Sequence, residues 1–169
     1  GYRVVDLGLA AGPTIIDYAA AYSAGEVLLC IVYNKSGGGR TAAQFWSANL
    51  GSSFVRVVGD LVVEGASARA PDSLDIIPGR DGGFIGIYLD TTPATDDVLV
   101  VTWPIASDRW DIDTPAEVTI SSTASYGPTA WRDEDGYVYA LYAVTAQDAG
   151  LSLIRSDDEG ATWEAFGGL

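Results

Sequence analysis

Charged side chains recur at one position of the sequence, four residues beyond each of three widely spaced prolines. They are Asp17, Asp75 and Arg132, with Asp133 next to the last. Carboxylates brought together from separate segments can bind a cation or the hydroxyl groups of a sugar. A pair of carboxylates at a suitable separation can also hydrolyse a glycoside. The chain has 23 acidic residues, so spacing in sequence cannot select such a pair, and solvent-facing turn residues are the alternative interpretation.

An acidic turn and the tryptophans offer two further kinds of site. Asp133-Glu134-Asp135-Gly136 resembles a calcium loop, but it lacks the third oxygen ligand and the closing glutamate. A type I′ hairpin turn is the simpler interpretation. Trp131, beside Arg132, is the tryptophan that we expect to stack against a ligand. Trp110 and Trp163 occupy a repeated anchor position, so we predict that they are buried core residues.

The composition excludes several classes of function. The chain has no histidine, which removes a Ser-His-Asp triad and the commonest zinc ligand, and we expect neither a metal nor a cofactor. Its net charge of -14 repels polyanions, so neither nucleic acid nor an anionic membrane is an expected partner. The single cysteine, Cys30, lies in an apolar run and is predicted to be buried. The sequence contains no apolar run of about 18 residues, which is the length that would predict a membrane-spanning helix.

Three units of similar sequence follow one another along the chain. Their starts, at Pro13, Pro71 and Pro128, lie 58 and 57 residues apart. In each unit a mixed segment and a turn lead into a strongly apolar run. These runs are residues 27–33, 84–89 and 137–142. Runs that are apolar on both faces and bounded by turn residues are typical of strands buried between two layers, so the sequence predicts an all-β protein.

The last unit contains an eight-residue turn motif with the pattern Ser-x-Asp-x-Gly-x-Thr-Trp. Its specified residues are Ser156, Asp158, Gly160, Thr162 and Trp163. The serine and aspartate side chains can hydrogen-bond the backbone of a tight turn, and the glycine can take a positive φ. The tryptophan then restarts a strand as a large apolar anchor. We interpret the motif as a structural hairpin.

A weakened copy of this motif occurs at the same phase of the first unit. Its matching residues are Ser47, Asn49, Gly51, Ser53 and Phe54. Asparagine replaces aspartate, serine replaces threonine and phenylalanine replaces tryptophan, so each physical role is kept. In the middle unit, residues 103–110 keep only the terminal aromatic residue.

The motif and its repetition resemble the Asp-box of the BNR-repeat, or sialidase-like, β-propellers. The resemblance covers essentially the whole chain through the repeat and places the boxes between the third and fourth strands of each blade. It implies a β-propeller segment of about three four-stranded antiparallel blades within a six- or seven-bladed ring. A β-sandwich is the alternative fold. Three blades alone would leave long unpaired edges, so we expect further blades or protein partners to complete the ring.

The repeat also predicts the boundaries of the blades. We expect residues 1–12 to be the tail of a preceding blade, and residues 13–70, 71–127 and 128–169 to be three successive blades. In the middle blade Trp110 is expected to open the outer strand, and residues 116–120 to cross to the next blade. The chain has no methionine, even at position 1, so we expect it to be a piece of a longer protein.

The resemblance implies that the repeated charged position surrounds a central channel. Asp17, Asp75, Arg132 and Asp133, with Trp131 beside them, are therefore the candidate residues for binding a cation or a sugar. We expect the side chains of Asp17 and Asp75 both to point into the channel.

The catalytic residues of the sialidase-like family do not map onto this chain. Those enzymes use three arginines on a substrate carboxylate, a tyrosine with a glutamate, and an aspartate. The usual Arg-Ile-Pro motif is absent, and Ile77-Pro78-Gly79-Arg80 has these residues in the wrong order. We therefore predict a non-catalytic binding or scaffold module of a virion, tail or cell-surface assembly, extracellular in location, with a glycan as its candidate ligand. The alternative is part of a sialidase-like glycoside hydrolase whose catalytic residues lie mostly outside this chain.

Overall fold

The computed structural model describes residues 7, 14–34, 40–60, 71–80, 82–90, 97–103, 116–121, 124–144 and 150–168. Within these residues every helix or strand assigned is a β-strand. The strands form three antiparallel sheets, and each sheet consists of four consecutive strands that pair in sequence order. The all-β fold predicted from the repeat is confirmed.

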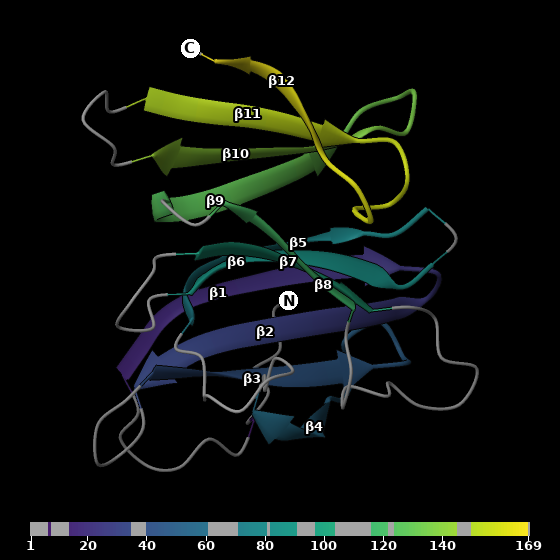
Figure 1. The fold of residues 1–169 in the computed structure, drawn as a ribbon. Helices are drawn as coiled ribbons and strands as arrows, with labels where there is room; N and C mark the ends of the chain where they lie inside the picture. Colours follow the sequence, from purple (N-terminus) through teal and green to yellow (C-terminus); the bar gives the residue numbers. More distant parts are fainter. Residues whose placement is uncertain are drawn as a thin grey trace.

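The three sheets follow one another along the chain. The first contains β1 (Thr14–Ser23), β2 (Glu26–Asn34), β3 (Arg40–Ser47) and β4 (Val55–Asp60). The second contains β5 (Pro71–Pro78), β6 (Phe84–Asp90), β7 (Asp97–Trp103) and β8 (Ala116–Ser121). The third contains β9 (Ala124–Arg132), β10 (Val138–Val144), β11 (Gly150–Ser156) and β12 (Glu164–Gly168). The second sheet lies between the other two (Figure 1).

The first strands of the sheets lie next to one another. β5 packs against β1 on one side and against β9 on the other. The remaining strands of each sheet follow outward from this inner row, and in Figure 1 those of the first sheet extend downward from β1 and those of the third sheet upward from β9.

The two faces of the second sheet belong to two different cores. Ile76 packs in the core shared with the first sheet, together with Leu28 and Cys30. Its neighbour Ile77 packs in the core shared with the third sheet, together with Val138. Successive side chains of a strand point to opposite faces, so a sheet covered on both sides needs consecutive apolar residues. Cys30 is buried, as predicted, and this burial raises the pKa of its thiol.

The turn between β9 and β10 is not the predicted type I′ turn. A hydrogen bond from Gly136 N to Asp133 O at 3.1 Å closes it. Gly136 is its one residue with a positive φ, at 93°, whereas a type I′ turn requires two. A Cβ atom at Gly136 would also lie 2.2 Å from Nη2 of Arg80. The positive φ therefore favours glycine here, and a side chain at this position would also displace the guanidinium of Arg80.

The outer strand of the second sheet begins later than the repeat predicts. Residues 116–121 form β8, which pairs with β7, so the expectation that residues 116–120 cross to the next unit is wrong. Residues 104–115 join β7 to β8, whereas residues 48–54 and 157–163 make the matching connections of the other sheets. Because this connection is longer, β8 begins later in the sequence than the repeat predicts. Trp110, the predicted anchor, lies outside the described residues.

A substitution at Leu28 tests the core between the first two sheets, where the side chain of Leu28 is 0% exposed. We expect Leu28→Ala to lower the free energy of unfolding by about 2–5 kcal/mol, because it leaves a cavity between the sheets. Urea denaturation followed by tryptophan fluorescence measures the loss. Leu151→Ala is the control, because that leucine is 44% exposed, and it should cost less than about 1 kcal/mol. Equal losses would contradict this placement of the core.

Candidate functional site

One serine and one aspartate hold the hairpin between β11 and β12. Ser156 Oγ accepts hydrogen bonds from the backbone N–H groups of Asp158, at 3.3 Å, and Gly160, at 2.8 Å. Ser156 also donates to Asp158 Oδ1 at 2.8 Å. Thr162 donates to Asp158 from its backbone, at 2.7 Å, and from its hydroxyl, at 2.6 Å. The indole N–H of Trp163 donates to Gly160 O at 3.0 Å, and this hydrogen bond holds the ring against the turn.

The hairpin between β3 and β4 contains the same pattern of hydrogen bonds. Ser47 Oγ accepts from Asn49 N at 3.3 Å and from Gly51 N at 2.9 Å. Ser53 N donates to Asn49 Oδ1 at 2.9 Å, and Asn49 Nδ2 donates to Ser53 Oγ at 2.9 Å. Phe54 packs, partly buried, against the core on the other face of the first sheet. An amide therefore keeps the geometry of the turn without a negative charge.

Both hairpins also hold a side chain in the left-handed region of φ. Leu50 has a φ of 57° and Glu159 a φ of 61°, and a glycine follows each. Such a conformation is unfavourable for any residue with a Cβ. Because one hairpin has leucine at this position and the other glutamate, the turn itself does not require a carboxylate.

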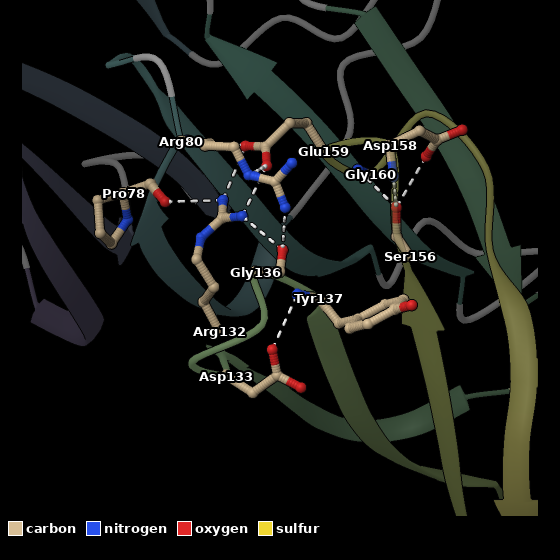
Figure 2. A network of polar contacts seen from close by, with 10 residues as sticks. All are labelled: Pro78, Arg80, Arg132, Asp133, Gly136, Tyr137, Ser156, Asp158, Glu159 and Gly160. Atoms are coloured by element: carbon tan, nitrogen blue, oxygen red, sulfur yellow. Dashed lines mark hydrogen bonds and ion pairs between the residues drawn. The ribbon is translucent and has the colours of Figure 1, made fainter.

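Glu159 instead connects three turns through two arginines (Figure 2). Arg132 pairs with both of its carboxylate oxygens, Nη1 to Oε1 at 2.6 Å and Nη2 to Oε2 at 2.7 Å. The same guanidinium donates to Pro78 O at 3.1 Å and to Gly136 O at 2.9 Å. Arg80 donates from its backbone to Glu159 Oε2, and from Nη2 to Gly136 O, both at 2.9 Å. We call this cluster the ionic junction.

Glu159 is the single carboxylate of the ionic junction, and it faces both of the guanidinium groups there. Partial burial raises the pKa of Glu159, but the hydrogen bonds and charges of Arg132 and Arg80 outweigh this and hold the pKa below its ordinary value. Two-pronged pairs between arginine and carboxylate are strong and fix the orientation of both groups. Arg132, a predicted ligand-binding residue, is therefore held by neighbouring turns.

Asp17 and Asp75 each bind the backbone of the next sheet. Oδ2 of Asp17 accepts from Leu74 N at 3.0 Å. Oδ2 of Asp75 accepts from Ala130 N and from Thr129 Oγ1, both at 2.9 Å. The other oxygen of each accepts from the backbone N–H of the following residue, at 2.9 and 2.8 Å. We call this repeated contact the carboxylate latch. The binding of a cation or a sugar by these residues stays a prediction.

The third charged residue of the repeated sequence position makes a different contact. Arg132 also lies four residues beyond its repeat proline, but it pairs with Val138 at the end of its strand as Pro78 pairs with Phe84, so it takes the structural place of Pro78. Its guanidinium reaches back to Pro78 O on the second sheet and to Glu159. Asp17 and Asp75 thus each bind the sheet that follows, whereas Arg132 binds the sheet that precedes.

Aromatic side chains gather on one face of the third sheet. Trp131 stacks on Tyr139 with ring centroids 5.4 Å apart and ring planes 9° apart. Phe166 meets Tyr139 edge-on, with centroids 5.3 Å apart. The guanidinium of Arg155 lies 4.9 Å from the ring centres of both Tyr137 and Phe166. We call these five side chains the aromatic surface.

The aromatic surface faces away from the second sheet. Ala130, Val138 and Ala140 alternate with the aromatic residues and lie in the core against the second sheet. Trp131 is 40% exposed and Phe166 is 49% exposed. Large apolar side chains gathered in the open are typical of binding surfaces.

Asp133 and Glu164 hold the aromatic surface in place. Asp133 Oδ2 accepts from the hydroxyl of Tyr139 at 3.0 Å, and Oδ1 accepts from Tyr137 N at 2.9 Å. Burial raises the pKa of Asp133, but these hydrogen bonds lower it to below its ordinary value. Glu164 forms an ion pair with Arg155. Of the predicted binding residues, the structure therefore brings Trp131 and Asp133 together through Tyr139.

A pocket of about 210 Å³ opens beside the ionic junction. It is lined by Arg80, Asp135, Tyr137 and Asp157. Sequence reasoning named none of these as binding residues, because they come from three separate turns that no motif connects. Nowhere in the described ranges do histidine, cysteine and acidic side chains form a group that could hold a metal ion. The described part of the chain also has no helix with the length and apolarity needed to cross a bilayer.

The chain is similar to known proteins in its three-dimensional structure but matches none of them in sequence comparisons. No protein-family model and no curated protein matches the chain. An exo-β-1,3-galactanase from Clostridium thermocellum matches with a TM-score of 0.59 and 13% identity, over 89% of this chain and 34% of that one. A GH43 β-1,3-galactosidase with galactodeoxynojirimycin matches with a TM-score of 0.61 and 11% identity, over 94% of this chain and 59% of that one.

A lectin also matches, and over almost its whole length. It is a fucose lectin from Kordia zhangzhouensis in complex with methyl-fucoside, with a TM-score of 0.50 and 12% identity, over 88% of this chain and 96% of that one. These neighbours are propeller proteins. The chain has a β-propeller fold. Its three sheets are blades of a propeller rather than layers of a β-sandwich, and the chain spans 34% and 59% of the two glycosidase chains.

Asp75 tests the carboxylate latch between the second and third blades. We expect Asp75→Ala to lower the free energy of unfolding by about 1–3 kcal/mol, because Ala130 N and Thr129 Oγ1 both lose their acceptor. Urea denaturation measures the difference. Glu134→Ala removes an exposed carboxylate from a nearby turn and should leave stability unchanged within about 0.5 kcal/mol. If both variants behaved alike, the latch would contribute nothing.

The pH dependence of stability tests the ionic junction. The pKa of Glu159 is lower in the folded protein than its ordinary value of 4.5, so its ion pairs stabilise the fold above pH 4.5. That contribution is lost as the pH falls through the folded pKa. We expect Glu159→Gln to melt at a lower temperature than the unmodified protein at pH 7, and the difference to close below pH 4.5. A difference that stays constant from pH 7 to pH 3 would contradict the assignment.

Proposed function

We propose that this chain is a non-catalytic carbohydrate-binding module with the β-propeller fold. The observation that carries the proposal is the aromatic surface, where Trp131 and Phe166 are exposed yet held in fixed positions. The C–H face of a sugar ring is apolar and packs against such rings. The sugar's hydroxyl groups then reach polar side chains at the rim, which is the usual composition of a small-molecule site.

The aromatic surface is ordered before any ligand arrives. Tyr139 supports the ring of Trp131 and is itself held by Asp133. Arg155 lies over Phe166 and pairs with Glu164, so a donor and an acceptor stand beside the rings. A surface that is already ordered loses little conformational entropy on binding. This arrangement suits recognition of a ligand.

The ionic junction supports a role without sialidase chemistry. A sialidase-type site holds the substrate carboxylate with a cluster of arginines. Here Arg80 and Arg132 both pair with Glu159, and both donate to Gly136 O. Both guanidinium groups therefore already contact a carboxylate of the protein itself. The similarity of fold to a fucose lectin, over 96% of the lectin chain, also supports binding without catalysis.

We also propose that residues 156–163 are an Asp-box and that residues 47–54 are a degenerate copy. The shared hydrogen bonds of Ser156 with Gly160 and of Ser47 with Gly51 support this proposal. Both hairpins join the third strand of a blade to the fourth. The chain then belongs to a larger ring, completed by further blades or protein partners, in an extracellular, cell-surface or virion-associated assembly where glycans are encountered.

A glycoside hydrolase is the second candidate function. It is favoured by the match to the galactanase over 89% of this chain but 34% of that enzyme, which leaves room for catalytic residues elsewhere in a longer protein. Hydrolysis of fluorogenic galactosides and sialosides by the full-length protein tests it. Turnover well above the uncatalysed rate would replace the non-catalytic proposal.

Trp131 tests the carbohydrate-binding proposal. We expect Trp131→Ala to weaken binding to galactoside- or fucoside-coated resin by about fivefold or more, because a stacking ring is lost. Frontal affinity chromatography measures the change, and circular dichroism checks that the fold is kept. Tyr22→Ala is the matched control, because Tyr22 is 56% exposed on the first blade. Binding that is insensitive to Trp131 but sensitive to Tyr22 would move the site to another face.

A further inference from the structure

The pocket beside the ionic junction has unused hydrogen-bonding capacity. Asp135 and Asp157 line it from two different turns, and both side chains are exposed. Neither carboxylate accepts a hydrogen bond from the rest of the described chain. Each can therefore accept two or more hydrogen bonds from a ligand, while Arg80, on the opposite turn, brings N–H donors.

The pocket adjoins the aromatic surface through Tyr137. This tyrosine lines the pocket, and its ring lies under the guanidinium of Arg155. The same guanidinium lies over Phe166, which contacts Tyr139 and, through it, Trp131. A chain of sugar residues could thus enter the pocket at one end and lie along the aromatic side chains with the rest.

The size of the pocket limits what it can hold. Its volume of about 210 Å³ is below the roughly 300–1,000 Å³ of pockets that enclose drug-sized ligands. A single sugar residue is smaller than a drug-sized ligand and suits a pocket of this volume. Its hydroxyl groups both donate and accept hydrogen bonds, which matches a pocket lined by two carboxylates and a guanidinium.

The charge of the pocket distinguishes neutral from acidic sugars. Asp135, Asp157 and Glu159 carry three negative charges, whereas Arg80 and Arg132 carry two positive charges, so the pocket and the ionic junction together have a net negative charge. The net charge of the whole chain, -14, adds to the repulsion of anions. A sugar carboxylate in this pocket would lie near protein carboxylates, and like charges disfavour its ionised form.

We propose that Arg80, Asp135, Tyr137 and Asp157 form a subsite for one neutral sugar residue, at the end of a glycan that lies along the aromatic surface. This inference rests on the proposed carbohydrate-binding function and adds its specificity. The two aspartates accept hydrogen bonds from neighbouring hydroxyl groups, and Arg80 donates to a hydroxyl or ring oxygen. Sialic acid and uronic acids are excluded by charge.

Titration of the full chain with simple methyl glycosides tests the subsite. Methyl galactoside, methyl fucoside and the methyl glycoside of sialic acid are added separately to isotope-labelled protein, and backbone amide shifts are followed by NMR. We expect at least one neutral glycoside to shift the amides of Tyr137 and Asp157, and the sialoside to shift neither. Asp135→Ala should raise the dissociation constant by about tenfold, the value of one hydrogen bond to a charged group.

The control is Glu134→Ala, which removes an equal charge from the same turn but does not line the pocket. It should leave the dissociation constant within about twofold. Asp135→Asn serves as a second variant, should the alanine variant not fold, and should also weaken binding. Neutral binding that Trp131→Ala weakens but both Asp135 variants leave intact would overturn the subsite and keep the proposed function. Tighter binding of the sialoside would also overturn the subsite. Failure of all glycosides and of longer glycans to bind would overturn both.

Discussion

The apolar faces of each sheet must be covered by a neighbouring sheet, and the fold depends on this packing between sheets. A four-stranded antiparallel sheet has two faces, and consecutive residues such as Ile76 and Ile77 supply both with isoleucine. The second blade therefore has a neighbour on each side (Figure 1). Hydrophobic burial is not directional, so the geometry of the stack needs additional polar contacts. The inner strands supply them, because Asp17 and Asp75 bind the backbone of the next blade.

The turns at one end of the blades use charge for the same purpose. Glu159 lies in an unfavourable backbone conformation, yet it holds Arg132 and the backbone of Arg80 with two oxygens. The equivalent residue of the first blade, Leu50, is 69% exposed and makes no such connection. One hairpin design therefore serves as a simple turn in the first blade and as a support for neighbouring turns in the third. The pocket lies where these supported turns meet.

Local patterns predicted the fold well, and the site less well. Alternation, turn residues and the spacing of Pro13, Pro71 and Pro128 depend on short-range physics, and the four-stranded units follow from them. The start of β8 was mispredicted because the preceding connection is longer than in the other blades. Trp131 could be selected because it stands alone on an inner strand. Asp135 and Asp157 could not, because 22 residues separate them in sequence and only tertiary packing places them on one pocket.

The contacts between the inner strands differ in direction along the chain. Asp17 and Asp75 act on the blade that follows, whereas Arg132 acts on the blade that precedes. The modules are therefore not interchangeable, although their strand layouts agree. Exchanging two of these modules would leave each of the three charged side chains without the backbone group that it binds in the neighbouring blade.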